Sequence, residues 1–197
     1  MLQNELTTAL KEWAVVQRSL LEGHQIILLR KGGLIEDTGD FDLKARQFLI
    51  YPTYAHETER AGDLQPCFGA WLKEEEDRKR PPVEIRIEAA AEVSDVVRVD
   101  DRAKLLTLAP QHIWSQQFID GRYDWEPYKP VFVLLLRVYA LASPVVVPVT
   151  RAYGGCRSWI ELEAPISTAG AVPAVSGERY ARRRELTLAL LSDSLAD

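Results

Sequence analysis

The chain has 197 residues, of which 47% are hydrophobic and 27% charged, and its net charge is −5 at neutral pH. This length and composition predict one domain with a sizeable buried core, and they exclude extensive disorder. The acidic balance argues against a nonspecific nucleic-acid binder, although a local basic patch could still bind an anion.

The cysteines and the hydropathy of the chain further restrict the class of protein. Cys67 and Cys156 lie outside any CxxC or Cys/His pattern, so we expect reduced thiols, with neither a zinc site nor a disulfide. The N-terminal segment lacks the basic start of a signal peptide. The longest apolar run, 131–136, is interrupted by Arg137 and is shorter than the ~20 residues of a membrane helix. We therefore expect a cytoplasmic protein without membrane contact.

Apolar residues at helical spacing predict a first helix over residues 8–21, with Thr7 or Thr8 as its N-cap and Gly23 in the left-handed position after its end. Alternating or continuous apolar runs predict strands, and charged or capped segments predict further helices. The predicted strands are 25–30, 47–52, 83–99, 130–141 with an extended continuation over 143–149, and 156–162; the further helices are a turn at 55–61, then 68–80, 109–118 and 177–195.

Turn and linker signals separate these elements. Gly32-Gly33 and Asp120-Gly121 predict turns. Pro144 and Pro148 indicate bends in the late strand, and residues 164–175, rich in Ala, Pro, Gly and Ser, predict a linker.

The order of elements favours an α+β fold. Strict βαβ alternation is missing, so a doubly wound sheet is disfavoured. We expect a small mixed or antiparallel β-barrel with peripheral helices and a C-terminal helix. Residues 1–163 would form this domain, and residues 164–197 a linker and a helix that packs on it or extends from it.

Several sequence blocks together point to a family. They are ALKEWAVV at 9–16, ILLRKGG at 27–33, FLIYPTYAH at 48–56, HIW at 112–114, LLLRVYAL at 134–141 and GCRSWIEL at 155–162. These blocks resemble a bacterial family named domain of unknown function 1802, over about residues 8–163. The resemblance implies no particular activity.

Gly23 and Arg30, after a helix and on a strand, carry a more distant resemblance to the ASCH branch of the PUA-like superfamily. That branch has Gly-x-Lys-x-x-Glu-x-Arg here, whereas this chain has Gln25 for the Lys and Leu28 for the Glu. The resemblance implies a PUA-like barrel, whose common ligands are RNA, modified bases and nucleotides. The two departures remove the residues expected of a catalytic ASCH protein, and fold alone does not fix function.

Two groups of residues are candidates for ligand binding. Arg30 and Lys31 could hold a phosphate or carboxylate, or they could be solvated charges at a strand end. Tyr51, Tyr54 and His56 could stack on a base and hydrogen-bond it, or they could be ordinary packing beneath the Pro52 corner.

Further candidates lie later in the chain. Trp159, beside Arg157, is either a stacking platform or part of the barrel wall. Arg137, isolated in an apolar strand, is either the anion site of a cleft or half of an ion pair with a carboxylate such as Glu161. His112 is a ligand contact or a packed side chain, followed by Trp114 as core.

The favoured hypothesis is a non-catalytic domain that binds RNA, DNA or a nucleotide-like small molecule without a cofactor. One alternative is a metal-dependent nuclease, in which Asp42 and nearby acidic residues hold Mg²⁺ and Lys44 assists an attacking water. Another is a protein-interaction module that docks through the arginine-rich helix at 179–184.

Overall fold

The computed structural model describes residues 2–31, 43–54, 61–78, 84–125, 127–154 and 157–192, without the side chains of residues 76 and 78. The predicted turn at 32–33, Asp42, His56 and Cys156 lie outside these ranges. The strands are β1 (Glu5–Trp13), β2 (Ile27–Lys31), β3 (Gln47–Thr53), β4 (Glu84–Val99), β5 (Val131–Pro148), β6 (Trp159–Ser167) and β7 (Val172–Pro173). The α-helices are α1 (Ala14–Leu21), α2 (Gly69–Arg78), α3 (Arg102–Thr107), α4 (Gln116–Asp124) and α5 (Gly177–Leu191), and short 3-10 helices lie at Ala61–Asp63, Pro66–Phe68, Ala109–Gln111 and Arg151–Tyr153.

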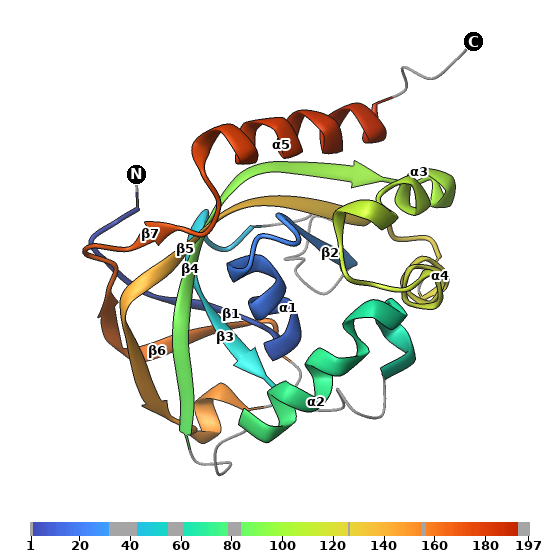
Figure 1. The fold of residues 1–197 in the computed structure, drawn as a ribbon. Coiled ribbons are helices and arrows are strands. Elements are labelled where there is room, and N and C mark those ends of the chain that lie inside the picture. Colours follow the sequence, from blue (N-terminus) through green and yellow to red (C-terminus); the bar gives the residue numbers. More distant parts are fainter. Residues whose placement is uncertain are drawn as a thin grey trace.

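All seven strands belong to one mixed sheet of order β2-β5-β4-β3-β1-β6, with β7 paired to β5 off this path. The β1–β3 pair is parallel and the other pairs are antiparallel. The sheet curls strongly, with helices around it and α5 across one side (Figure 1). The predicted α+β fold is confirmed, with its mixed barrel-like sheet, peripheral helices and C-terminal helix. Along the described strands, hydrogen bonds do not close the sheet into a ring.

Irregular pairing between the long strands β4 and β5 bends the sheet. The register shifts between Ile87 and Ala89, and again between Val93 and Asp95. Such bulges bend a strand and increase its twist. The first irregularity includes Pro144 on β5, as the predicted bend requires. The second leaves Ser94 as the extra residue on β4, beneath α5.

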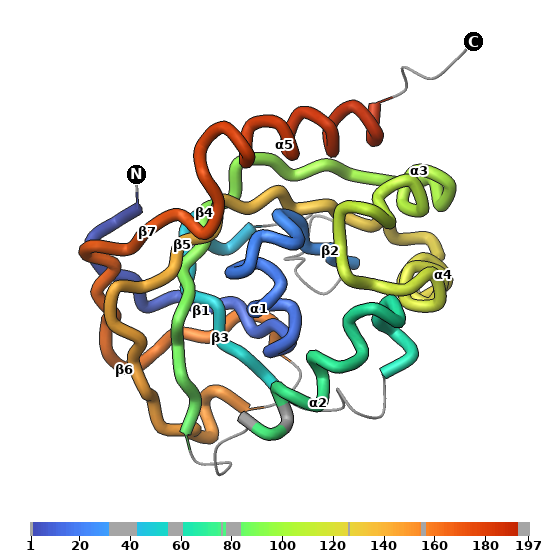
Figure 2. The backbone as a smooth tube through the Cα atoms, viewed as in Figure 1, coloured from blue at the N-terminus to red at the C-terminus, as the bar shows by residue number. Residues whose placement is uncertain are grey.

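The bent sheet separates two hydrophobic cores. One lies between the sheet and α1, α3, α4 and α5, and includes Phe48, Leu105, Ile113 and Leu135. The other lies inside the curl formed by β1, β3, β6 and the far halves of β4 and β5. Alternate residues of the Ala89–Ala91 stretch belong to the two cores, and all three are fully buried. Figure 2 shows β4 and β5 running through both halves of the molecule.

The prediction of a helix from residue 8 is wrong, because residues Glu5–Trp13 form β1 and the helix begins at Ala14. β1 pairs with β3 on one side and β6 on the other, so the tertiary hydrogen bonds outweigh the helical spacing of its apolar residues. The end of the helix is as predicted, since Gly23 follows it with φ of 71°.

Three other expectations are corrected. The single helix at 109–118 is a 3-10 turn followed by α4, and Asp120-Gly121 lies inside α4 rather than in a turn. Helix α3 was not predicted. Its N-cap Asp101 accepts from the Ala103 N–H, and this cap is the sequence signal that could have located it. Much of the predicted linker at 164–175 belongs to strands, the end of β6 and β7.

Candidate functional site

Arg30 and Lys31 both bond within the protein. The Arg30 guanidinium donates to Glu12 Oε2 at 2.6 Å and to the Lys11 carbonyl at 3.2 Å, and both charged side chains are nearly buried. This contact joins β2 to β1, which are not neighbours in the sheet. Lys31 is buried and donates to the Tyr123 carbonyl. The geometry gives both residues structural contacts that bridge separate elements.

Tyr51 and Trp159 lie in the two cores. Tyr51 packs edge-on against Tyr153 at 6.0 Å between ring centroids, and its burial raises the pKa of the phenol, with a smaller contribution from Tyr153. The Trp159 ring packs against Phe48 at 5.0 Å and is 7% exposed. Neither ring presents an open face for stacking. Tyr54 is different, because it lines a pocket beside α1 and α2.

The expected Arg137–Glu161 ion pair is not formed. Arg137 lies on β5 with its guanidinium 5.5 Å from the ring of Tyr180 in α5, whereas Glu161 lies on β6 and accepts from the Thr8 hydroxyl. β5 and β6 are not adjacent in the sheet. Arg137 therefore contacts the C-terminal helix through a cation–π interaction.

Gln25 and Leu28, the two departures from the sequence pattern expected of an ASCH protein, both lie inside the protein. Gln25 is fully buried; its Oε1 accepts from Ser19 Oγ and from the Ile113 N–H, and its Nε2 donates to the Ile27 carbonyl. Leu28 is a core residue. The amide of Gln25 is satisfied within the protein and links α1, β2 and the segment before α4.

His112 is also an internal group. It is buried, its Nδ1 accepts from the Trp114 N–H, and its Nε2 has no partner within the described structure. Burial lowers the pKa of His112 to about 4, although backbone hydrogen bonds oppose this. The imidazole is therefore neutral at physiological pH.

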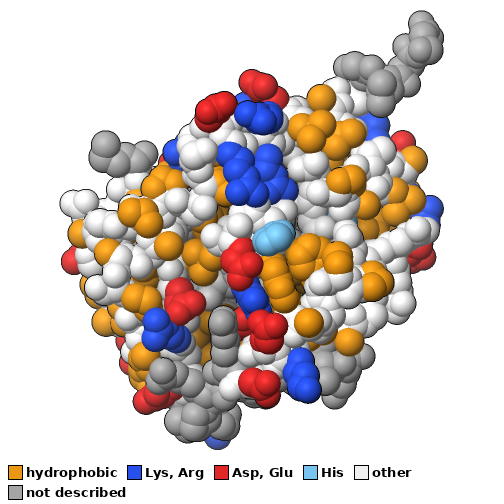
Figure 3. Space-filling view, in the orientation of Figure 1, with side chains coloured by type: hydrophobic (Ala, Val, Ile, Leu, Met, Phe, Trp, Pro, Cys, Tyr) orange, Lys and Arg blue, Asp and Glu red, His pale blue; other side chains and the backbone are white. Residues whose placement is uncertain are grey.

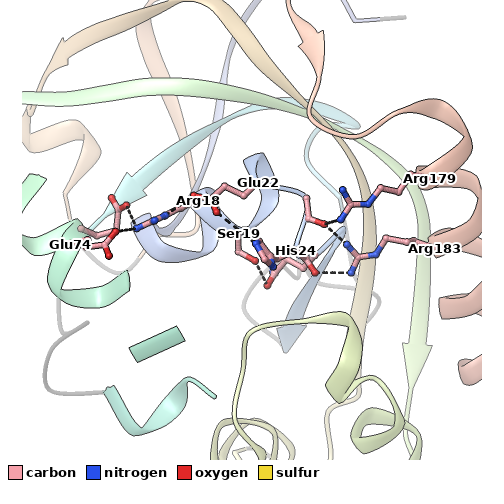
Figure 4. Close-up of polar contacts among 10 residues, drawn as sticks. Arg18, Ser19, Glu22, His24, Glu74, Arg179 and Arg183 are labelled. Atoms are coloured by element: carbon pink, nitrogen blue, oxygen red, sulfur yellow. Dashed lines mark hydrogen bonds and ion pairs between the residues drawn. The ribbon is translucent and has the colours of Figure 1, made fainter. Parts of the chain in front are cut away.

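A different group of side chains does meet at the surface. We call it the His24 surface and define it as His24, Phe68, Trp71, Arg179 and Arg183. They come from the loop after α1, from the 3-10 helix Pro66–Phe68 and the first turn of α2, and from α5, three segments that are far apart in the sequence. Figure 4 shows Arg179 and Arg183 reaching from α5 toward the loop that carries His24. On this face, basic side chains lie next to a histidine and a strip of hydrophobic side chains (Figure 3).

The two arginines are adjacent on one face of α5 and share an acceptor. Arg179 Nη2 donates to the Gly23 carbonyl at 3.0 Å, and Arg183 donates to the same carbonyl and to that of His24. These carbonyls follow the C-terminal end of α1, where positive charge is favourable. Among the described residues, neither guanidinium has a carboxylate partner. Burial and the nearby Arg179 lower the pKa of Arg183, which indicates a site that lacks negative charge.

Three rings lie beside these arginines. The exposed imidazole of His24 is 5.0 Å from the Trp71 ring and 5.7 Å from Phe68, and the two aromatic rings are 5.1 Å apart, all edge to face. Phe68 and Trp71 are half-buried. The Arg18 guanidinium lies 4.4 Å from the centre of the Trp71 ring and also binds Glu22 and Glu74.

Sequence reasoning missed this surface as a binding site. It predicted helices at 68–80 and 177–195, which contain α2 and α5 as the structure describes them, and it took the arginines of α5 as a docking element for a partner. In the structure α5 packs on its own domain, where Arg184 forms a bidentate pair with Asp95 that lowers the pKa of this carboxyl, and Tyr180 bonds Ser94. The arginine spacing of four residues was the available signal, because it places 179 and 183 on one helix face.

The proposed nuclease residues are only partly visible. Lys44 is exposed before β3, and Asp42 lies outside the described residues. Within the described ranges, no three His, Cys, Asp or Glu side chains are placed to hold a metal ion. Within the same ranges, none of the helices has the length and hydrophobicity to span a membrane.

The sequence profile of a family described as "Domain of unknown function (DUF1802)" matches residues 9–186. The chain belongs to this family. The match extends into α5, so it includes Arg179 and Arg183 of the His24 surface. No curated protein sequence is significantly similar to this DUF1802 chain.

Solved structures of the ASCH protein from Zymomonas mobilis are similar to this chain. The crystal structure of the Zymomonas mobilis protein is 14% identical in sequence to this chain, covers 91% of this chain and 93% of its own, and has a TM-score of 0.42. A Ser-to-Ala mutant of it is 14% identical, covers 94% and 99%, and has a TM-score of 0.43.

Proposed function

We propose that the protein binds RNA or a nucleotide, without catalysis, at the His24 surface. The observation that carries this proposal is the pair of adjacent guanidiniums, Arg179 and Arg183, which lack a carboxylate partner within the described structure. Two neighbouring positive charges without a counter-charge favour an anion between or beside them, because the anion removes their mutual repulsion.

The donors that remain suit a phosphate. Only Nη2 of Arg179 makes a hydrogen bond in the described part of the chain, so its other N–H groups are available to a ligand. Guanidinium groups match phosphate oxygens in a two-pronged geometry, and such charge-assisted bonds are about twice as strong as neutral ones. Arg183 donates to carbonyls of the α1–β2 loop and links α5 to this loop.

The adjacent rings suit a base. His24 is exposed, and Phe68 and Trp71 each keep part of their surface accessible. Aromatic side chains beside a basic groove are the usual means of binding single-stranded nucleic acid, and each stacked base contributes about 1–3 kcal/mol. A phosphate on α5 and a base on α2 would together span the surface, which supports a nucleotide or a short single strand over a simple anion.

Fluorescence anisotropy with labelled single-stranded RNA, single-stranded DNA and nucleotide competitors tests this proposal. Arg179→Gln should weaken binding by roughly 10- to 150-fold, because one charge-assisted contact contributes roughly 1.5–3 kcal/mol. It should also reduce the slope of the logarithm of the binding constant against the logarithm of the salt concentration by about one, because one fewer counterion is released on binding. Phe68→Leu should weaken the binding of ligands that contain a base but leave the binding of inorganic phosphate unchanged.

Arg182→Gln is the matched control. Arg182 has the same charge, lies on the same helix and binds the exposed Glu178 instead of the α1–β2 loop. Equal weakening by Arg179→Gln and Arg182→Gln would show a diffuse charge effect and reject the site. Absence of saturable binding by RNA, DNA and nucleotides at low salt would reject the function.

A further inference from the structure

The positive charge of the His24 surface converges on one point. Arg179 Nη2 and Arg183 Nη1 donate to the same oxygen, the carbonyl of Gly23, so the two guanidinium groups meet just beyond the end of α1. Figure 4 shows both side chains turned toward this loop. A single strand of nucleic acid, by contrast, is held by basic side chains that follow its backbone along a groove.

The arginines around this point are neutralised by carboxylates. They form ion pairs within α5 and around α1: Arg182 with Glu178, Arg184 with Asp95, and Arg18 with Glu22 and Glu74. In Figure 3, acidic side chains lie both above and below the central basic cluster. Among the described side chains of α1 and α5, the unneutralised arginines are therefore confined to positions 179 and 183.

The amount of charge distinguishes two kinds of phosphate. A phosphate monoester has a second pKa of about 6 and carries about two negative charges at neutral pH. A phosphodiester inside a strand carries one negative charge. A monoester can therefore neutralise both Arg179 and Arg183, whereas a diester leaves one of the two charges uncompensated.

The free donors agree with this difference. Nη1 and Nε of Arg179 and Nε of Arg183 make no hydrogen bond within the described structure. Arg179 is exposed, and Arg183 Nε is not fully buried, so a ligand can reach both side chains. A monoester offers three terminal oxygens as acceptors, one more than a diester.

We propose that the His24 surface is specific for a terminal phosphate monoester on a nucleotide, either a free mononucleotide or the phosphorylated end of a strand. The phosphate lies on Arg179 and Arg183, and the base of the same nucleotide stacks on Phe68 or Trp71. His24 joins the two halves, because its carbonyl accepts from Arg183 at 2.7 Å and its ring lies 5.0 Å from that of Trp71. This inference rests on the proposed function and narrows its ligand.

Two matched pairs of ligands test the proposal on the unaltered protein. The first pair is adenosine 5′-monophosphate and its methyl ester, which differ by one charge, compared by calorimetry. The second is a short RNA with and without a 5′-phosphate, labelled at its 3′ end and compared by fluorescence anisotropy. We expect the monoester of a pair to bind at least about tenfold more tightly, because it gains a charge-assisted contact. A preference in the first pair alone assigns the site to free mononucleotides, and a preference in both pairs includes strand ends.

Variants of α5 locate the preference. Arg179→Gln should remove most of it and should melt like the unaltered protein, because Arg179 is exposed. Arg182→Gln, which breaks only the pair with Glu178, should keep it. Equal affinity within both pairs, with binding that still depends on Arg179, would overturn the inference and leave the proposed function standing. A preference that persists in Arg179→Gln would also overturn the inference, and absence of binding by all four ligands would overturn both.

Discussion

The Glu12–Arg30 contact allows a direct measurement of how the curled sheet is held together. The carboxylate and guanidinium are 2.6 Å apart, and their side chains are only 11% and 12% exposed. Arg30 Nε is already buried without a partner. Glu12→Gln would leave a nearly buried guanidinium without a counter-charge, and removing one partner of such a pair costs about 3–5 kcal/mol.

For a chain of this length, that loss should lower the melting temperature by roughly 6–20 °C, because each kcal/mol corresponds to about 2–4 °C. Urea unfolding followed by tryptophan fluorescence measures the free energy directly. The double variant Glu12→Gln/Arg30→Met should lose clearly less free energy of unfolding than the two single variants lose in sum, since it removes both charges together.

Glu178→Gln is the matched control, because it breaks the exposed pair with Arg182 and should hardly change stability. A change of under about 0.5 kcal/mol in Glu12→Gln would refute the reasoning, since that is the range of neutral surface substitutions. From the sequence alone, Arg30 was either a candidate ligand-binding residue or a solvated charge at a strand end, whereas in the structure its guanidinium bonds Glu12 and the Lys11 carbonyl.

Three further predictions concern other buried groups. The pKa of His112 is about 6.5 in the unfolded chain and about 4 in the folded protein, so between these values the unfolded state binds more protons. As the pH falls from 6.5 to 4, the free energy of unfolding should therefore drop by about 3 kcal/mol through this group. Denaturation of His112→Asn, measured against pH, should lack that component. Gly23→Ala should cost more than about 1–2 kcal/mol by calorimetry, because φ is +71° and the new Cβ would lie 2.4 Å from Val175 Cγ1. Tyr180→Phe removes the bond to Ser94 and should cost about 1 kcal/mol; unchanged protease resistance and melting of this variant would show that the bond does not anchor α5.

Local pattern was sufficient wherever the residues of an element carry their own signal. The alternation over Glu84–Val99, the apolar run that begins β5, and the charged α2 and α5 were predictable, because period and propensity are properties of consecutive residues. Gly23 was predictable for the same reason, since a residue with positive φ after a helix is usually glycine.

The first element shows where such reasoning ends. Residues Glu5–Trp13 have helical spacing of apolar residues, yet they form a strand because β3 and β6 supply hydrogen bonds on both sides. Arg30 likewise had the sequence context of a ligand-binding residue, and only the curl of the sheet brings Glu12 to it.

The amino-acid sequence by itself determined the fold class, the family and most of the helices and strands. Only the tertiary structure decided which polar side chains are internal and which gather at a surface. His24, Trp71 and Arg179 are distant in sequence and meet because α2 and α5 pack near the end of α1. Gln17 and Gln25 differ through their surroundings, which leave Gln17 Oε1 buried without a partner in the described structure and pair the Gln25 amide with Ser19, Ile27 and Ile113. Contacts between distant segments depend on packing, which no window of consecutive residues contains.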